Sequence, residues 1–205
     1  TSNYGLDKFY SVINNIDVSK INILNNEEYN WRSIGDSDNL FTGSFNGNNK
    51  VIKNINQKSE TNNVVYGGFF GKTQNASISN VKLQNIVVDI SASRESNDSS
   101  AFGGALVGYS DASNISNVTV EGATIISVEG QKEVCAGGVI GFVNNGSIKS
   151  ITSSNTISVN STNTFNSNQT AGAATNIAGW IGFKDTTTAK EYYARTGGIA
   201  GVVKN

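Results

Sequence analysis

The stretch "GALVGYSDASNISNV", residues 104–118, recurs twice more in this chain with a closely similar sequence. The related stretches are "GGFFGKTQNASISNV" (67–81) and "GGVIGFVNNGSIKSI" (137–151). In each copy, the glycine that closes a Gly-x-apolar-apolar-Gly element stands seven residues before an isoleucine. The closing glycines are Gly71, Gly108 and Gly141, and the isoleucines are Ile78, Ile115 and Ile148. Three copies with identical internal spacing indicate a structural repeat.

The segments between these copies predict strands rather than helices. Short β-branched runs, such as "IVVDI" (86–90) and "TIISV" (124–128), are bounded by Gly, Asn or Ser, whereas helical periodicity is almost absent. Each repeat contains about three such runs. The closing glycines are 37 and then 33 residues apart, which suits one coil of a solenoid. The sequence therefore predicts an all-β fold, a parallel β-helix with about three strands per coil and four to five coils.

Stacking of coils explains why the same residue types recur at the same positions of each repeat. Equivalent residues of successive coils would lie about 4.8 Å apart, so that apolar side chains form continuous columns. Asn80 and Asn117 are expected to form an asparagine ladder at a corner, and Cys135, among apolar residues, is expected to be buried. The predicted apolar columns are Phe69, Leu106, Val139 and Ile199, and Ile78, Ile115 and Ile148.

The repeat spacing also predicts how the chain is organised. We expect a single domain, with an entry region at residues 1–30, regular coils at 31–160 and an excursion at 161–195. The pattern restarts at 196–205, where "TGGIAGVVKN" matches "GGVIGFVNN". An alternative is that "AGWIG" (178–182) is itself a degenerate coil start. Because the pattern stops just after a coil begins, we expect the chain to be a piece of a longer protein.

Composition argues against several function classes. Charged residues make up 15% of the chain, the formal net charge is −1 and there is no basic run, so the electrostatic signature of nucleic-acid binding is missing. No apolar run reaches the length of a membrane helix. Histidine is absent, which removes histidine-based catalytic triads and the usual zinc sites. The single cysteine cannot form an intramolecular disulfide.

The carboxylates offer little for catalysis because they are scattered along the chain. The nearest approach to a cluster is Asp36 and Asp38 in "GDSDN", to which a neighbouring coil could add Asp17. Such a group could hold Ca²⁺, but two alternating acids more often serve a turn. We therefore expect no catalytic residue, no cofactor and no enzymatic activity in this chain.

The Gly-Gly-apolar-apolar-Gly element followed by "ISN" resembles the GLUG motif of secreted and cell-surface bacterial proteins. The segment at 29–55 resembles the one that commonly precedes GLUG repeats, although Asn46 stands where aspartate is usual. The resemblance covers residues 13–159 and the last ten residues. The matching upstream positions are Trp31, Ile34, Gly35, Phe41, Gly43, Phe45, Asn46, Gly47 and Asn48.

This resemblance implies a right-handed parallel β-helix in a secreted or surface-anchored adhesin with a role in virulence. The motif residues are scaffold residues, so the resemblance transfers no catalytic residue. Similar repeats also occur in the non-catalytic N-terminal regions of IgA-directed metallopeptidases. An accessory repeat region of a secreted peptidase or polysaccharide-acting enzyme is therefore the alternative.

Binding to another molecule is the function that the sequence favours, with a host surface protein or a glycan as partner. The candidate contact residues are aromatic side chains in and beside the uncharged part of the excursion: Phe165, Trp180, Tyr192 and Tyr193. Aromatic residues in such a segment can equally serve as anchors against the solenoid wall. The open ends of a coil stack also predict possible end-to-end self-association.

Overall fold

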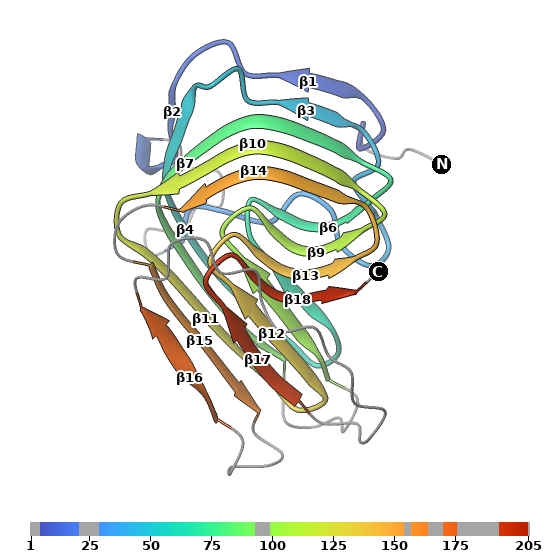
Figure 1. Ribbon diagram of the computed structural model, residues 1–205, viewed down its shortest axis with the longest axis vertical. Coiled ribbons are helices and arrows are strands. Elements are labelled where there is room, and N and C mark those ends of the chain that lie inside the picture. The colour runs from blue at the N-terminus through green and yellow to red at the C-terminus, as the bar shows by residue number, and fades with distance from the viewer. Residues whose placement is uncertain are drawn as a thin grey trace.

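The computed structural model describes residues 5–20, 29–92, 99–153, 157–163, 170–175 and 193–204, with the backbone alone for 157–163, 170–175 and 193–194. It is an all-β parallel β-solenoid of about four turns, which confirms the predicted fold class. Successive coils lie side by side and the chain advances by one strand spacing per turn (Figure 1).

Each coil passes through three sheets, here called sheets 1, 2 and 3. Sheet 2 contains β5 (Val65–Gly67), β8 (Ala101–Gly104), β12 (Glu133–Gly137) and β17 (Tyr193–Gly197). Sheet 3 contains β6 (Phe70–Gln74), β9 (Val107–Asp111), β13 (Ile140–Asn144) and β18 (Ala200–Lys204). All pairings within these two sheets are parallel.

Sheet 1 is ten-stranded and bends along its strands, so that it covers two sides of the solenoid (Figure 1). Its first half contains β1 (Phe9–Ser11), β3 (Ser44–Asn46), the start of β7 (Ser77–Ala92), β10 (Asn114–Glu121) and β14 (Ser147–Ser153). Its second half contains β2 (Ile16–Asp17), β4 (Val51–Thr61), the end of β7, β11 (Thr124–Gly130), β15 (Ile157–Asn163) and the antiparallel strand β16 (Thr170–Thr175). A 3₁₀ turn, η1 (Val18–Lys20), follows β2.

The register of the strands confirms the predicted apolar columns. Ile115 lies opposite Ile78 on one side and Ile148 on the other. In the second column, the amide of Leu106 donates to the carbonyl of Val139, whose own amide donates to Ile199. Phe69, Leu106, Val139 and Ile199 are all buried in one core cluster. Equivalent side chains therefore stack from coil to coil, each covering the core of its neighbour.

The asparagine ladder is also confirmed, and it is longer than predicted. The side-chain amide of Asn117 donates to the side-chain oxygen of Asn80, and that of Asn80 donates to Asn46, each over 3.1 Å. Asn80 and Asn117 both have a positive φ, which asparagine tolerates better than most residues. The ladder thus marks a bend that recurs in each coil.

The glycine-rich element is a corner between two strands rather than a strand by itself. The strands of sheet 2 end at the first glycine of the element, and those of sheet 3 begin three residues later. The strands of sheet 2 were not anticipated as separate elements. A Cβ on the closing glycine Gly141 would lie 2.5 Å from the carbonyl oxygen of Gly108, so glycine is needed for the close approach of the two backbones.

The register also delimits the excursion. In the second coil two residues, Gln131 and Lys132, join β11 to β12. In the third coil β15 and β17 pair with those same strands, but residues 164–192 separate them. The paired strands therefore reach three residues into each end of the segment predicted at 161–195. β16 lies within this segment and pairs antiparallel with β15.

Candidate functional site

The aromatic residues proposed from the sequence as contact residues lie at the margin of what the structure describes. Phe165, Trp180 and Tyr192 lie outside the described residues. Tyr193 is the first residue of β17, where its backbone lies opposite Glu133 of β12. The structure therefore neither brings these four residues together nor separates them.

Asp36 serves a turn. Its Oδ1 accepts hydrogen bonds from the backbone amides of Asp38 and Asn39 over 2.9 and 2.8 Å, the geometry of an Asx turn. Asp17 does not join this pair, because its carboxylate accepts from the Ser19 hydroxyl and the Asn54 amide and lies 3.6 Å from Lys53 Nζ. Among the described residues, no group of three His, Cys, Asp or Glu side chains could hold a metal ion.

Cys135 is fully buried, as predicted. Burial raises the pKa of its thiol, and the neighbouring carboxylate of Glu133 raises it further. The thiol is therefore kept protonated and unreactive at neutral pH. In the part of the chain that the structure describes, no helix is long and apolar enough to span a membrane.

A second apolar cluster lies outside the main core and joins sheets 2 and 3. Its rings alternate between stacked and edge-to-face contacts, with centroids 4.8–6.1 Å apart. Lys72 lies over the rings of Tyr66 and Tyr109, and Lys204 lies over Phe142. The aromatic members are Tyr66, Phe102, Tyr109 and Phe142. We call this set the outer aromatic cluster.

Tyr66, the first residue of this cluster, also borders a hollow. Tyr66 stacks on Phe102 of the next coil, with centroids 5.7 Å apart and ring planes 14° apart. Among the described strands, its strand β5 lies at the edge of sheet 2. Tyr66 lines a hollow of about 300 Å³ at this end of the coil stack, which we call the entry pocket.

The wall of the entry pocket comes from β4, where the core changes character. Gln57, Ser59 and Thr61 lie opposite Val88, Ile90 and Ala92 of the next coil. The three residues of the next coil are almost completely buried in the apolar core. The same core-facing positions are therefore polar in β4, where no regular coil covers them, and apolar one coil further on.

The floor of the entry pocket is a closed hydrogen-bond network. Gln57 is 2% exposed, and its amide nitrogen donates to Ser33 Oγ over 2.7 Å. The Gln57 side-chain oxygen accepts from the backbone amide of Gly68, and Ser33 Oγ donates to the Gly68 carbonyl. Because each polar atom of Gln57 has a partner, the floor is held in one arrangement.

The rim of the pocket carries polar groups with spare hydrogen-bonding capacity. Within the described residues, neither Arg32 nor Asp36 makes an ion pair, although both line the pocket. Thr61 Oγ1 is buried and has no hydrogen-bond partner there. Burial raises the pKa of the Tyr66 hydroxyl to about 12, and the charges of Tyr109 and Asp36 contribute to the shift. The Tyr66 hydroxyl therefore remains protonated at neutral pH.

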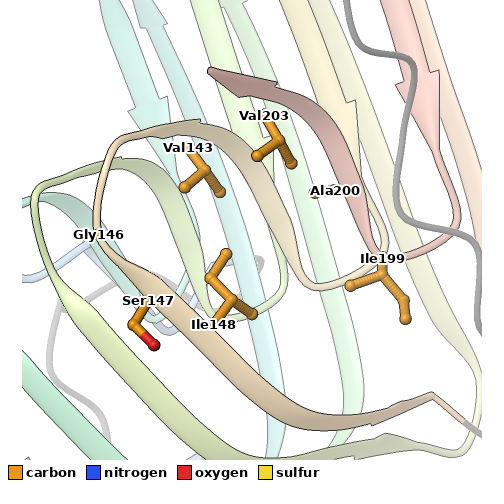
Figure 2. A pocket seen from close by; sticks show the side chains of 7 residues that line it. All are labelled: Val143, Gly146, Ser147, Ile148, Ile199, Ala200 and Val203. Atoms are coloured by element: carbon orange, nitrogen blue, oxygen red, sulfur yellow. The ribbon is translucent and has the colours of Figure 1, made fainter. Parts of the chain in front are cut away.

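The opposite end of the coil stack has a different chemistry. A hollow of about 310 Å³ lies between β13, β14 and β18. The side chains of Val143, Ile148 and Val203 meet there (Figure 2). Ile199 and Ala200 also line it, and Ser147 is its one polar side chain. Its lining is almost entirely apolar and resembles a core rather than a polar site.

The sequence contained a signal for the entry pocket that our sequence analysis did not use. In the run "VIKNINQKSET" of β4, the buried aliphatic residues Ile52 and Ile55 give way to Gln57, Ser59 and Thr61. The change becomes meaningful only once the register with β7 is known.

Comparison with protein-family models, with curated proteins and with solved structures finds no match for this chain.

Proposed function

We propose that this chain is a non-catalytic binding region of a secreted or surface-exposed bacterial protein of the adhesin type, which contacts a glycan or a protein of a host. The resemblance of its repeats to the GLUG motif supports the extracellular setting. A regular solenoid supports the binding role because it is a rigid scaffold that presents side chains at fixed positions.

The observation that carries this proposal is the entry pocket. Its floor is held by the network of Gln57 and Ser33. Among the described residues, Arg32 and Asp36 make no ion pair and the Thr61 hydroxyl has no hydrogen-bond partner. A preformed pocket with a fixed floor can orient a small ligand through polar groups placed beside an aromatic ring. Polar residues alone would also suit a solvated core end, but the ring of Tyr66 beside them and the closed network of the floor favour a ligand site.

The proposal is tested by screening the chain against a glycan array and a panel of host surface proteins. In the variant Ser59→Leu, an aliphatic side chain fills the pocket below Ile90, its neighbour in the same core column. We expect Ser59→Leu to abolish binding while the protein remains as stable as the parent, because the added side chain extends an apolar column. Ser127→Leu makes the same change at a half-exposed position of β11 and serves as the matched control.

A third variant tests the excursion. Residues 164–192 are replaced by a short Gly-Ser link, which leaves β15 and β17 in place. Binding that survives this change and is lost in Ser59→Leu supports the entry pocket as the binding site. Binding lost only in the linked variant moves the site to the excursion, with Phe165, Trp180 and Tyr192 as candidates. No binding by the folded parent chain contradicts the proposed function.

A further inference from the structure

We infer that the entry pocket recognises an uncharged saccharide, with one sugar ring stacked on Tyr66 and its hydroxyl groups held by Arg32, Asp36 and Thr61. This inference rests on the proposed binding function and names its ligand class. It is argued from the size of the pocket, its aromatic wall, its charge balance and its unpartnered polar atoms.

The size of the pocket limits the ligand. A volume of about 300 Å³ stands at the lower end of the range of about 300–1,000 Å³ that is usual for small-molecule sites. That space suits one or two sugar rings better than a folded protein surface. The Gln57 network closes the pocket on the side of the core.

Tyr66 supplies the aromatic wall. Its ring is held by the stacked contact with Phe102 and by the edge-to-face contact with Tyr109, whose ring centroid lies 6.1 Å away. A ring fixed in this way loses little conformational entropy when a ligand packs against it. The apolar C–H face of a pyranose packs well on such a surface, while its hydroxyl groups remain at the edge. The protonated Tyr66 hydroxyl adds one more hydrogen-bonding group.

The charges of the pocket argue for an uncharged ligand. Among the described residues, Arg32 and Asp36 contribute one positive and one negative group to the lining, and Tyr66 is the other ionisable side chain there. Lys72, whose Nζ lies 5.3 Å from the centroid of the Tyr66 ring, does not line the pocket. An acidic sugar would meet the Asp36 carboxylate, and a basic ligand would meet the Arg32 guanidinium. A sugar hydroxyl can donate to a carboxylate and accept from a guanidinium, so a neutral polyol uses both groups.

The polar atoms of the pocket match such a polyol. Asp36 Oδ1 is used by the turn, since it accepts from the amides of Asp38 and Asn39, but among the described residues no donor lies on Oδ2. Thr61 Oγ1 is buried and unpartnered within the described residues, and a buried hydroxyl without a partner is costly. A ligand hydroxyl at this point would satisfy it.

The test measures affinity for neutral and acidic oligosaccharides of matched length, by glycan array and then by isothermal titration calorimetry at low and high salt. We expect binding to neutral glycans with an affinity that changes less than about twofold with ionic strength, since no net charge is neutralised. Asp36→Asn keeps an oxygen for the turn and removes the charge, and Arg32→Gln keeps an amide donor. Each is expected to weaken binding about tenfold, because a charge-assisted hydrogen bond is replaced by a neutral one.

Two variants provide matched controls. Asp38→Asn removes the neighbouring exposed carboxylate, which does not line the pocket, and Lys50→Gln removes a positive charge elsewhere. Both should bind the neutral glycan as the parent does. Circular dichroism and the urea unfolding midpoint establish that all four variants are folded.

The outcomes separate this inference from the proposed function. Binding restricted to acidic glycans, or affinity that falls steeply with salt, overturns the uncharged-saccharide inference and leaves the binding function intact. If the chain binds a host protein but none of the glycans, the saccharide inference is likewise overturned and the binding function stays intact. Equal losses in Asp36→Asn and Asp38→Asn also overturn the inference, because the pocket carboxylate would then have no specific role. A folded chain that binds nothing in either screen contradicts both.

Discussion

The side-chain amide of Asn117 donates a hydrogen bond of 3.1 Å to the side-chain oxygen of Asn80, its counterpart one coil earlier, and both residues have φ close to +55° (53° and 55°). One residue type thus serves two needs at this bend. It tolerates the left-handed backbone, and its amide carries both a donor and an acceptor for the coils on either side.

These two contributions can be separated by substitution at Asn117. Asn117→Ala loses the ladder bond and forces a Cβ into the left-handed region, so we expect a loss of about 2 kcal/mol in the free energy of unfolding. Asn117→Gly also loses the ladder bond, but glycine adopts the left-handed backbone without strain. We therefore expect it to lower the free energy of unfolding by about 1 kcal/mol. Urea unfolding followed by circular dichroism measures both. Equal losses for the two variants would show that the backbone conformation carries no cost.

In the third coil the ladder can be extended by adding an asparagine instead of removing one. Ser150 stands where the ladder would continue and has φ of 54°, yet its side chain is too short to reach Asn117 in the same manner. Ser150→Asn should stabilise the protein by about 0.5–1 kcal/mol, because it adds an amide bond and suits the backbone. Ser116→Asn, on the same face of the repeat but outside the ladder, should give no gain. A stabilisation shared by both variants would point to a general effect of asparagine.

The closing glycine of the corner is expected to tolerate no side chain. In Gly141→Ala the new Cβ would lie 2.5 Å from the Gly108 carbonyl oxygen and 2.8 Å from the backbone of Gly103. Backbone atoms of neighbouring strands cannot move aside, so we expect a loss of about 3 kcal/mol or failure to fold. In the control Gly130→Ala, the nearest atom is Val134 Cγ2 at 3.1 Å, and a side chain can shift. Thermal unfolding that is the same for both would refute this account of the corner.

The lowered pKa of Asp17 predicts how the stability of the protein changes in acid. Its pKa is lowered to about 2, first by the hydrogen bond from the Ser19 hydroxyl, then by that from the Asn54 amide, with a further contribution from Lys53. The ionised form is favoured in the folded state, so this stabilisation is complete above the ordinary pKa of 3.8 and is lost as the pH falls through about 2. Carboxyl ¹³C NMR titration measures the pKa directly. A midpoint near 3.8, or a stability profile below pH 4 unchanged in Asp17→Asn, would contradict the prediction.

End-to-end self-association, expected from the open ends of the coil stack, stays a prediction. The hollow in Figure 2 exposes Ile148 and Val203 at one end of the molecule. We expect Ile148→Lys to lower any concentration-dependent association in sedimentation velocity, because a charge replaces a half-buried aliphatic group. Ile125→Lys, at a residue that is 49% exposed on the outer face of β11, is the matched control. A parent chain that is monomeric at every concentration would refute the prediction.

Much of this architecture could be read from the repeats. The identical spacing of the glycines and isoleucines predicted the register in which Ile78, Ile115 and Ile148 pair, and the asparagine ladder followed from Asn80 and Asn117. These features are local and periodic, so each copy in the sequence supports the others. The strands of sheet 2 were missed because they are three to five residues long and run into the glycines of the corner.

The sequence by itself determined that the chain forms stacked coils, since the spacing and type of the repeated residues already contain the corners and the columns. The tertiary structure alone decided where the entry pocket lies. Gln57, Ser59 and Thr61 become the wall of a pocket only because β4 pairs with β7 at the end of the stack, opposite Val88, Ile90 and Ala92. The segment with Arg32 and Asp36 lies against the same end through contacts with residues more than thirty positions away, such as the bridge from Ile34 to Phe70. Contacts between distant residues depend on how the coils stack, and no short stretch of sequence specifies that packing.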